Sequence, residues 1–119
     1  MATLIALLST GKGTWGHVSE LIAQEEWEHV FLITNEFGKE KYTNEKPFTA
    51  IVVDNRKPAQ ELAKDVEESL RGKVADTEVA LNLVSGSGQE HMAVLAALLR
   101  LGLGVRLVVA GEERMVTLS

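Results

Sequence analysis

Hydrophobic and polar positions alternate along the chain in blocks of two different periods. Five short apolar runs have the length and composition of strands that are buried on both faces, as in a parallel sheet. These runs are Thr3–Ser9, His29–Thr34, Phe48–Val53, Glu78–Val84 and Val105–Ala110. A sixth strand over Arg114–Leu118 is predicted to pair with the fifth as a hairpin, because Gly111 and Glu112 form a turn between them.

Three segments between these runs have helical periodicity. The first is Thr14–Gln24, which places apolar residues three and four positions apart. The second has Pro58 at its first helical position and ends at Gly72, and the third runs from Gln89 to Leu101. The remaining stretch, Glu36–Pro47, is polar and punctuated by glycine and proline, so a surface loop is predicted there.

The order of these elements predicts the fold class. Strands that alternate with helices across short turns form right-handed crossovers in a mostly parallel sheet. We therefore expect an α/β protein with a small Rossmann-like, mostly parallel sheet between helices and a C-terminal β-hairpin. The 119 residues are typical of one domain, residues 1–119. A binding site must then lie on this one core or between copies of it.

Composition excludes several classes of function. The chain has no cysteine, which removes disulfides, thiolate metal sites and cysteine nucleophiles. A net charge of −5 argues against binding to long nucleic acid. No apolar run is long enough for a membrane span, and the opening apolar segment lacks a basic start, so we expect a cytoplasmic protein without a membrane partner. The histidines have no metal-ligand spacing, and we expect neither a metal nor a cofactor.

The first candidate for chemistry is the loop after the first predicted strand. In open α/β sheets, ligands bind beyond the carboxyl ends of the strands. A G-x-G-x-x-G pattern there can offer backbone N–H groups to phosphate, and its candidate ligand-binding residues are Gly11, Gly13, Thr14, Trp15 and Gly16. Glu36 follows at the spacing of a ribose-binding acid. The alternative is a tight strand-to-helix turn with Trp15 packed over it.

The loop after the fourth predicted strand is the second candidate. Glycines and serines that lead into a helix make an anion-binding nest, here formed by Ser85, Gly86, Ser87, Gly88 and Gln89. Two such loops at one end of a sheet are a more specific signal for phosphate than one. The alternative is that both loops are simply short turns between a strand and a helix.

These loops resemble those of a known family. The stretch from Asn82 to Ala93 (NLVSGSGQEHMA), together with the ending Leu101–Val109, is similar to the later motif of CRISPR-associated Rossmann fold (CARF) domains. The resemblance covers nearly the whole chain in element order and is specific in the two loops. It implies a homodimer that binds a cyclic oligoadenylate across its two-fold axis, and in some members, the ring nucleases, cleaves it. Gln89 stands where the family often has a lysine.

The resemblance and the loop positions suggest a role for each polar residue. We expect Lys12 and Arg56 to supply positive charge, and Asn35 and Gln89 to contact base or ribose. If the chain cleaves its ligand, the catalytic candidates are Ser9, Thr10, Lys12 and His91. For His91 the alternative is a helix cap or a solvent-facing side chain, and for Arg56 an ordinary surface turn.

The helix over residues 89–101 is apolar nearly all round. A helix that covers one face of a sheet needs only one apolar stripe, so the excess predicts a homodimer contact through this helix. Burial by neighbouring helices within one chain is the alternative. Two other functions stay open. One is a minimal NAD- or mononucleotide-binding module that rests on G-x-G-x-x-G and Glu36, and the other is a non-catalytic dimerisation module.

Overall fold

The computed structural model describes residues 2–9 and 12–119, without the side chain of Lys12. Its elements follow the predicted alternation of strands and helices. The strands are β1 (Ala2–Leu7), β2 (Trp27–Thr34), β3 (Thr49–Val52), β4 (Glu78–Asn82), β5 (Gly104–Val109) and β6 (Val116–Thr117). The helices are a 3-10 turn η1 (Lys12–Thr14), α1 (Trp15–Gln24), α2 (Glu36–Lys41), α3 (Ala59–Leu70) and α4 (Gly88–Arg100).

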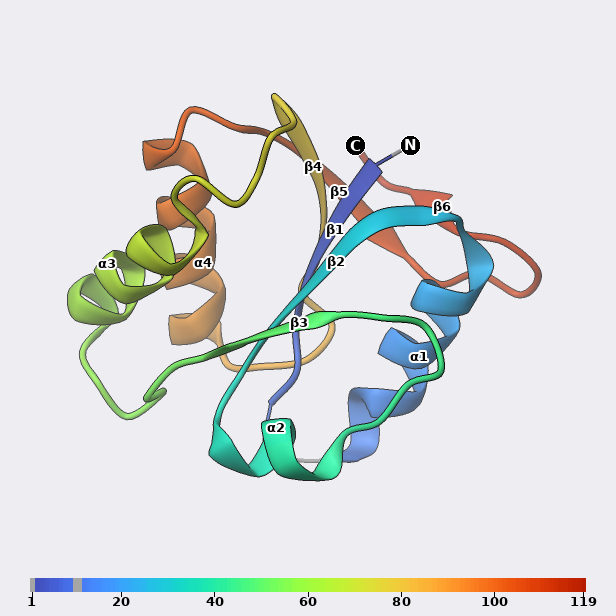
Figure 1. Cartoon of the computed structure of the whole chain (residues 1–119), viewed down its shortest axis with the longest axis horizontal. Helices are drawn as coiled ribbons and strands as arrows, with labels where there is room; N and C mark the ends of the chain where they lie inside the picture. Colours follow the sequence, from blue (N-terminus) through green and yellow to red (C-terminus); the bar gives the residue numbers. More distant parts are fainter. Residues whose placement is uncertain (1, 10–11) are drawn as a thin grey trace.

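The described strands form one six-stranded sheet in the order β3-β2-β1-β4-β5-β6 (Figure 1). Strands β1 to β5 pair in parallel, and β6 runs antiparallel to β5. This confirms the predicted α/β class, with a mostly parallel sheet between helices and a C-terminal hairpin. Because the chain leaves β1 towards β2 and leaves β4 towards β5, the strand order reverses between the neighbours β1 and β4.

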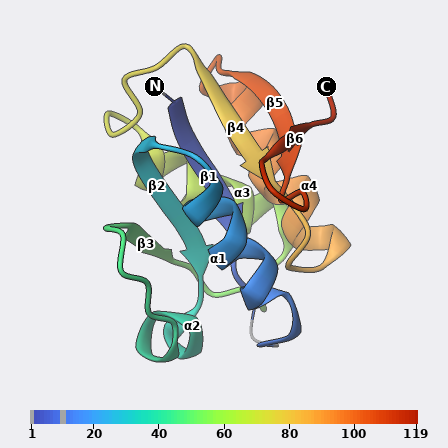
Figure 2. The same cartoon turned by 90° about the vertical axis from the view of Figure 1, so that its right-hand side faces the viewer.

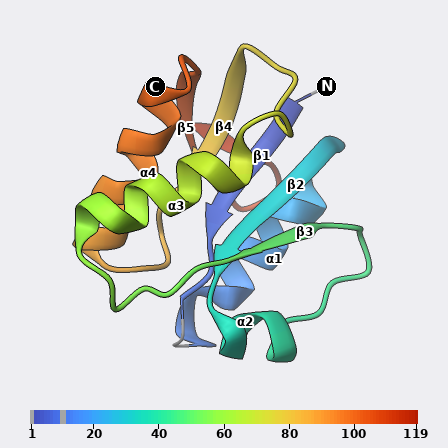
Figure 3. The same ribbon diagram turned by 60° about the vertical axis from the view of Figure 1, so that its left-hand side comes forward.

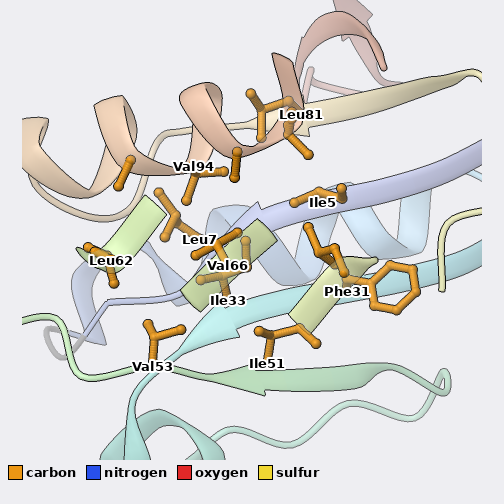
Figure 4. Packing of buried hydrophobic residues seen from close by; sticks show 14 of the residues in the cluster. Ile5, Leu7, Phe31, Ile33, Ile51, Val53, Leu62, Val66, Leu81 and Val94 are labelled. Atoms are coloured by element: carbon orange, nitrogen blue, oxygen red, sulfur yellow. The ribbon is translucent and has the colours of Figure 1, made fainter. Parts of the chain in front are cut away.

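Helices cover both faces of the sheet, with α1 on one face and α3 and α4 on the other (Figures 1 and 3). Figure 2 views the molecule from the α1 side. Strand β1 is buried on both faces, and its alternate residues enter two separate cores. Leu4 lies in the cluster with α1, whereas Ile5 and Leu7 lie in the cluster with α3 and α4 (Figure 4). A strand that is buried on both faces must be apolar at successive positions, and β1 is such a strand.

One predicted loop is wrong in its first half, because residues 36–41 form α2. Asn35 caps this helix, and its Oδ1 accepts the Gly38 N–H at 2.9 Å. A Cβ at Gly38 would overlap Thr34 Oγ1, so α2 packs directly on the end of β2. Polar composition suggested a loop, but the cap and the glycine contact favour one short helix.

Other differences lie at element ends. Pro58 is the N-cap of α3 rather than its first helical residue, and α3 ends at Leu70, before Gly72. Gly72 adopts a φ of +79°, which terminates the helix. In the described part of the chain, no helix combines the length and apolar character that a membrane span requires.

Candidate functional site

The loops after β1 and β4 meet where the strand order reverses. The Ser9 backbone N–H donates to Ser85 Oγ at 2.7 Å. The Ser9 carbonyl oxygen accepts the indole N–H of Trp15 at 2.9 Å. Ser9 is thus held from both sides, at the point where ligands bind in sheets of this strand order.

Trp15 belongs to an aromatic cluster rather than to an open binding surface. Its ring centroid lies 6.0 Å from that of Phe37 and 5.6 Å from that of Tyr42. Tyr42 in turn stacks edge-on against Phe48 at 5.5 Å. The cluster joins α1 to α2, so the indole fixes the loop after β1 by packing as well as by its bond to Ser9. This geometry favours the packing alternative for the Trp15 side chain.

The loop after β4 is equally constrained. Ser85 is fully buried, and its carbonyl oxygen lies 2.9 Å from His91 Nε2. Gly86 adopts a φ of +98°, and a Cβ there would lie 3.2 Å from Leu7 Cδ1. A side chain at this position would therefore be strained as well as crowded. The Ser85 side chain joins the two loops and is not at the surface, whereas Gly86 brings the backbone close to β1.

A carboxylate occupies the start of α4. Ser87 Oγ accepts the Glu90 N–H at 3.2 Å, and Glu90 Oε1 accepts the Ser87 N–H at 2.8 Å. This reciprocal pair is a capping box. The negative charge of Glu90 thus stands at the positive end of the helix dipole. Gly88 begins the helix, but within the nest predicted over Ser85–Gln89 the Ser87 N–H is already bonded to a carboxylate of the chain itself.

The start of η1 and α1 has a different electrostatic character. Neither element has an acidic residue in its first turn, and Thr14, the N-cap of α1, makes no side-chain capping bond. Thr14 Oγ1 is buried and has no hydrogen-bond partner within the described structure. The predicted residues Thr10 and Gly11, and the side chain of Lys12, lie outside the described residues.

The two described glycines of the G-x-G-x-x-G pattern, Gly13 and Gly16, are not required by packing. A Cβ at Gly13 or Gly16 would meet nothing within 4 Å. In a dinucleotide-binding fold, the third glycine allows the helix to approach the strand closely. Gly16 has no such neighbour here, which weakens the dinucleotide interpretation.

A groove of about 600 Å³ lies beside the switch point, at the carboxyl ends of β2 and β3. Its polar lining comprises Asn35, Glu36, Asp54, Asn55 and Arg56. Arg56 Nε donates to Asp54 Oδ1 at 3.0 Å, and this bond holds the pKa of the Asp54 carboxyl below its ordinary value. The pair is exposed, so a ligand can displace it at small cost.

Gln89, at the start of α4, contacts the loop after β3. Its Nε2 donates to the Lys57 carbonyl oxygen at 2.9 Å. The Lys57 ammonium is itself paired with Asp65 at 2.8 Å. The structure therefore joins the loops after β3 and β4 through Gln89, while Arg56 and Lys57 are each neutralised by a carboxylate.

Two hydrogen-bonded side chains under the site were not singled out as site residues from the sequence. Asn82, the last residue of β4, donates from Nδ2 to the Val108 carbonyl oxygen at 2.9 Å and lies 3.2 Å from His17 Nε2. The same His17 nitrogen accepts the Ala110 N–H at 3.3 Å. Nε2 of His17 is therefore the unprotonated nitrogen. The sequence signal that could have predicted this pair is an asparagine at the end of an apolar strand. Its partner His17 lies on α1, 65 positions away along the chain, so the sequence did not indicate the pairing.

The two remaining histidines differ in position. His91 Nε2 faces a carbonyl oxygen, which only accepts, so this nitrogen carries the proton and the neutral ring has its lone pair on Nδ1. His29 lies at the exposed amino-terminal half of β2, away from the site. Within the described residues, no group of His, Asp and Glu side chains is arranged to hold a metal ion.

Comparison with family models and with curated proteins found no match. The resemblance to CARF domains therefore stays a prediction, carried by the residues quoted above.

Proposed function

We propose that this chain is a cytoplasmic, CARF-like homodimer that binds a cyclic oligoadenylate or a related nucleotide at the carboxyl edge of its sheet. The observation that carries the proposal is the junction between the β1 and β4 loops, where the Ser9 N–H bonds to Ser85 Oγ. This junction lies at the switch point in strand order, and it is ordered by contacts within the chain. Backbone that is already held in place binds a ligand without the cost of ordering it first.

The phosphates are best accommodated at the start of η1. The first N–H groups of a helix lack partners within it, and no acidic residue lies in this turn. Thr14, the last residue of η1, has a buried hydroxyl without a hydrogen-bond partner in the described structure. The start of α4 is less suitable because Glu90 places a carboxylate there. Arg56 can add charge by exchanging Asp54 for a phosphate oxygen.

The groove between α2 and the β3 loop suits a ribose or base. Glu36 is exposed there, and its carboxylate can accept a ribose hydroxyl. Asn35 lines the same groove and caps α2 through its Oδ1, so its backbone position is fixed at the end of β2. Gln89 bonds to the neighbouring Lys57 of the β3 loop and would approach the ligand from the start of α4.

The outward side of α4 supports the homodimer. Met92 and Leu99 are exposed, and both lie on the side of the helix that faces away from the sheet. Exposed apolar patches of this kind mark interaction surfaces. A second copy would cover them and would bring two carboxyl edges into one assembly.

Cleavage of the ligand would require positioning more than a nucleophilic side chain. A ribose 2′-hydroxyl can attack the adjacent phosphorus in line, with loss of the 5′-oxygen as leaving group. The lone pair on His91 Nδ1 can accept the hydroxyl proton, and a proton from water completes the 5′-hydroxyl as it leaves. His91 borders Ser85 and is the described candidate for this role. Ser9 is held by its backbone, and Thr10 and Lys12 remain candidates from the sequence.

The minimal NAD or mononucleotide module remains the alternative function. Its support is Glu36, which follows β2 at the start of α2. It predicts a higher melting temperature with NAD or ATP, which Glu36→Ala abolishes. A non-catalytic dimerisation module would instead show no thermal response to any nucleotide.

Titration with cyclic tetra-adenylate and cyclic hexa-adenylate by calorimetry tests the proposal, and chromatography of the same mixtures detects cleavage. We expect binding of at least one ring with one ligand per dimer. His91→Gln should retain binding and abolish any cleavage. Absence of binding to both rings would contradict the proposal, and stabilisation by NAD alone would favour the alternative.

A further inference from the structure

The face of the β5–β6 hairpin that lies on the α4 side is apolar and open. Val108 belongs to the core with α1, whereas Val105 packs against the core with α4, so alternate β5 residues face opposite sides. Val109 pairs with Val116, and the Leu118 N–H donates to the Leu107 carbonyl oxygen at 2.8 Å. Directly opposed residues of antiparallel strands share a face. Leu107, Val116 and Leu118 therefore lie on the α4 side and form what we call the hairpin patch.

The three side chains of the hairpin patch are substantially exposed, at 37% for Leu107, 45% for Val116 and 63% for Leu118. The opposite side of the hairpin is better covered. There Val108 is buried, and the region forms one wall of a cavity of about 610 Å³ next to the end of α1. The apolar surface of the hairpin is therefore concentrated on its α4 side.

A second apolar surface lies on α4 itself. Met92 is 69% exposed and Leu99 is 63% exposed, and they are seven residues apart on one side of the helix. Leu95 and Ala96 lie between them and are partly exposed. The buried residues Ala93, Val94, Ala97 and Leu98 occupy the other side. Met92, Leu95, Ala96 and Leu99 form what we call the helix patch.

We infer that the helix patch of each copy packs on the hairpin patch of a second copy. This rests on the homodimer of the proposed function and adds its interface. Both patches consist of uncharged side chains, so neither patch adds a carboxylate to a contact between two copies of a chain of net charge −5. The patches are different surfaces of one molecule, and a two-fold axis makes their contact reciprocal, with two equivalent halves.

The direction of the two-fold axis follows from the sheet. Helix α4 and the hairpin patch lie on the same side of the sheet, so the α4 of a partner can lie over the hairpin next to the first α4. An axis parallel to the strands then encloses both α4 helices between two sheets. It also places the two carboxyl edges at the same end of the dimer, as one shared ligand requires. An axis perpendicular to the strands would put these edges at opposite ends.

A charge exchange tests the reciprocal contact, and it is measured by sedimentation without nucleotide. Met92→Lys and Leu118→Glu each place a charge at a surface position, so the monomer should keep its fold and melting temperature. Each variant alone should dimerise on the order of tenfold more weakly or worse, because its charge is buried without a partner. An equal mixture should recover a heterodimer, in which the introduced ammonium of one copy lies opposite the introduced carboxylate of the other. Thr43→Glu, an exposed position after α2, is the matched control and should dimerise normally.

The outcomes separate this interface from the rest of the proposal. If Met92→Lys weakens the dimer and Leu118→Glu does not, the helices contact each other alone and the inference is wrong. If the mixture remains monomeric while the unmodified chain is dimeric, it is also wrong. A monomeric unmodified chain would overturn both the interface and the homodimer. Nucleotide binding is decided separately by the calorimetric titration.

Disulfide trapping gives an independent measurement, since the chain contains no cysteine. Oxidation with diamide of an equal mixture of Met92→Cys and Leu118→Cys should produce a mixed disulfide dimer in preference to either symmetric one. A mixture of Thr43→Cys and Leu118→Cys is the control and should yield little product. Predominant Met92→Cys self-dimers would instead indicate direct contact between the two α4 helices and would overturn the reciprocal arrangement.

Discussion

The backbone N–H of Ser9 and the hydroxyl of Ser85 form a 2.7 Å hydrogen bond between residues 76 positions apart. The bond joins the two loops that leave neighbouring strands in opposite directions. Because Ser85 is fully buried, solvent does not compete for this hydroxyl. The Ser9 backbone is therefore held at this junction before any ligand arrives, because Trp15 also bonds to it from the other side.

Replacement of Ser85 by alanine should loosen this junction. The Ser9 N–H would lose its partner, and we expect a loss of about 1–2 kcal/mol in the free energy of unfolding. Nucleotide affinity should fall as well, because the β1 loop would need to be ordered on binding. Chemical denaturation and calorimetry measure the two effects. Ser69→Ala, a partly buried helical position on α3, is the control, and equal effects of both substitutions would contradict this role for Ser85.

Two glycine substitutions should have opposite effects on stability. Gly16→Ala adds a methyl group that meets nothing within 4 Å, so it should stabilise α1 by a few tenths to about 1 kcal/mol. Gly86→Ala must adopt a φ of +98° and should cost on the order of 1–2 kcal/mol. Thermal denaturation of both variants checks this. If Gly16→Ala abolished nucleotide binding, the dinucleotide interpretation of the glycine pattern would gain support.

The substitution Glu90→Gln distinguishes two contributions of Glu90 at the start of α4, its capping hydrogen bond and its negative charge. Glutamine can keep the bond to the Ser87 N–H, so the helix should lose only about 0.3–1 kcal/mol from its dipole interaction. Removal of the carboxylate should strengthen nucleotide binding by roughly two- to fivefold at low salt, if phosphates come near α4. Calorimetry at two salt concentrations tests this, with the exposed Glu113→Gln as control. An unchanged affinity would mean that the phosphates bind away from α4.

Glu67 should make stability depend on acid. The side-chain hydrogen bond from Arg100, at 2.7 Å, is the main cause that holds the pKa of Glu67 below its ordinary value of 4.5. The unfolded chain therefore binds a proton more readily, and the stabilisation is present above pH 4.5 and is lost as the pH falls through the lower folded pKa. Melting temperatures between pH 7 and pH 3 should decrease less for Glu67→Gln than for Glu68→Gln. Parallel curves for the two variants would contradict the prediction.

Local signals in the sequence were sufficient for some features and were misread for others. The strand and helix order follows from hydrophobic periodicity and was predicted correctly outside residues 36–41. Ser87 and Glu90 have the S-x-x-E spacing of a capping box, but glycines beside them favoured an anion nest. Asn35 and Gly38 likewise had the spacing of a helix cap, which the polar composition of the segment obscured.

The amino-acid sequence by itself determined the class of fold, because burial of each strand and helix imposes a period that is visible in a short window. Only the tertiary structure decided how the polar groups are used. Ser9 meets Ser85, His17 meets Asn82, and Gln89 meets Lys57 across 76, 65 and 32 positions. Such partners depend on which strands become neighbours and on the directions in which side chains leave them. Side-chain hydrogen bonds form between atoms about 3 Å apart in space, and no spacing along the chain encodes that distance.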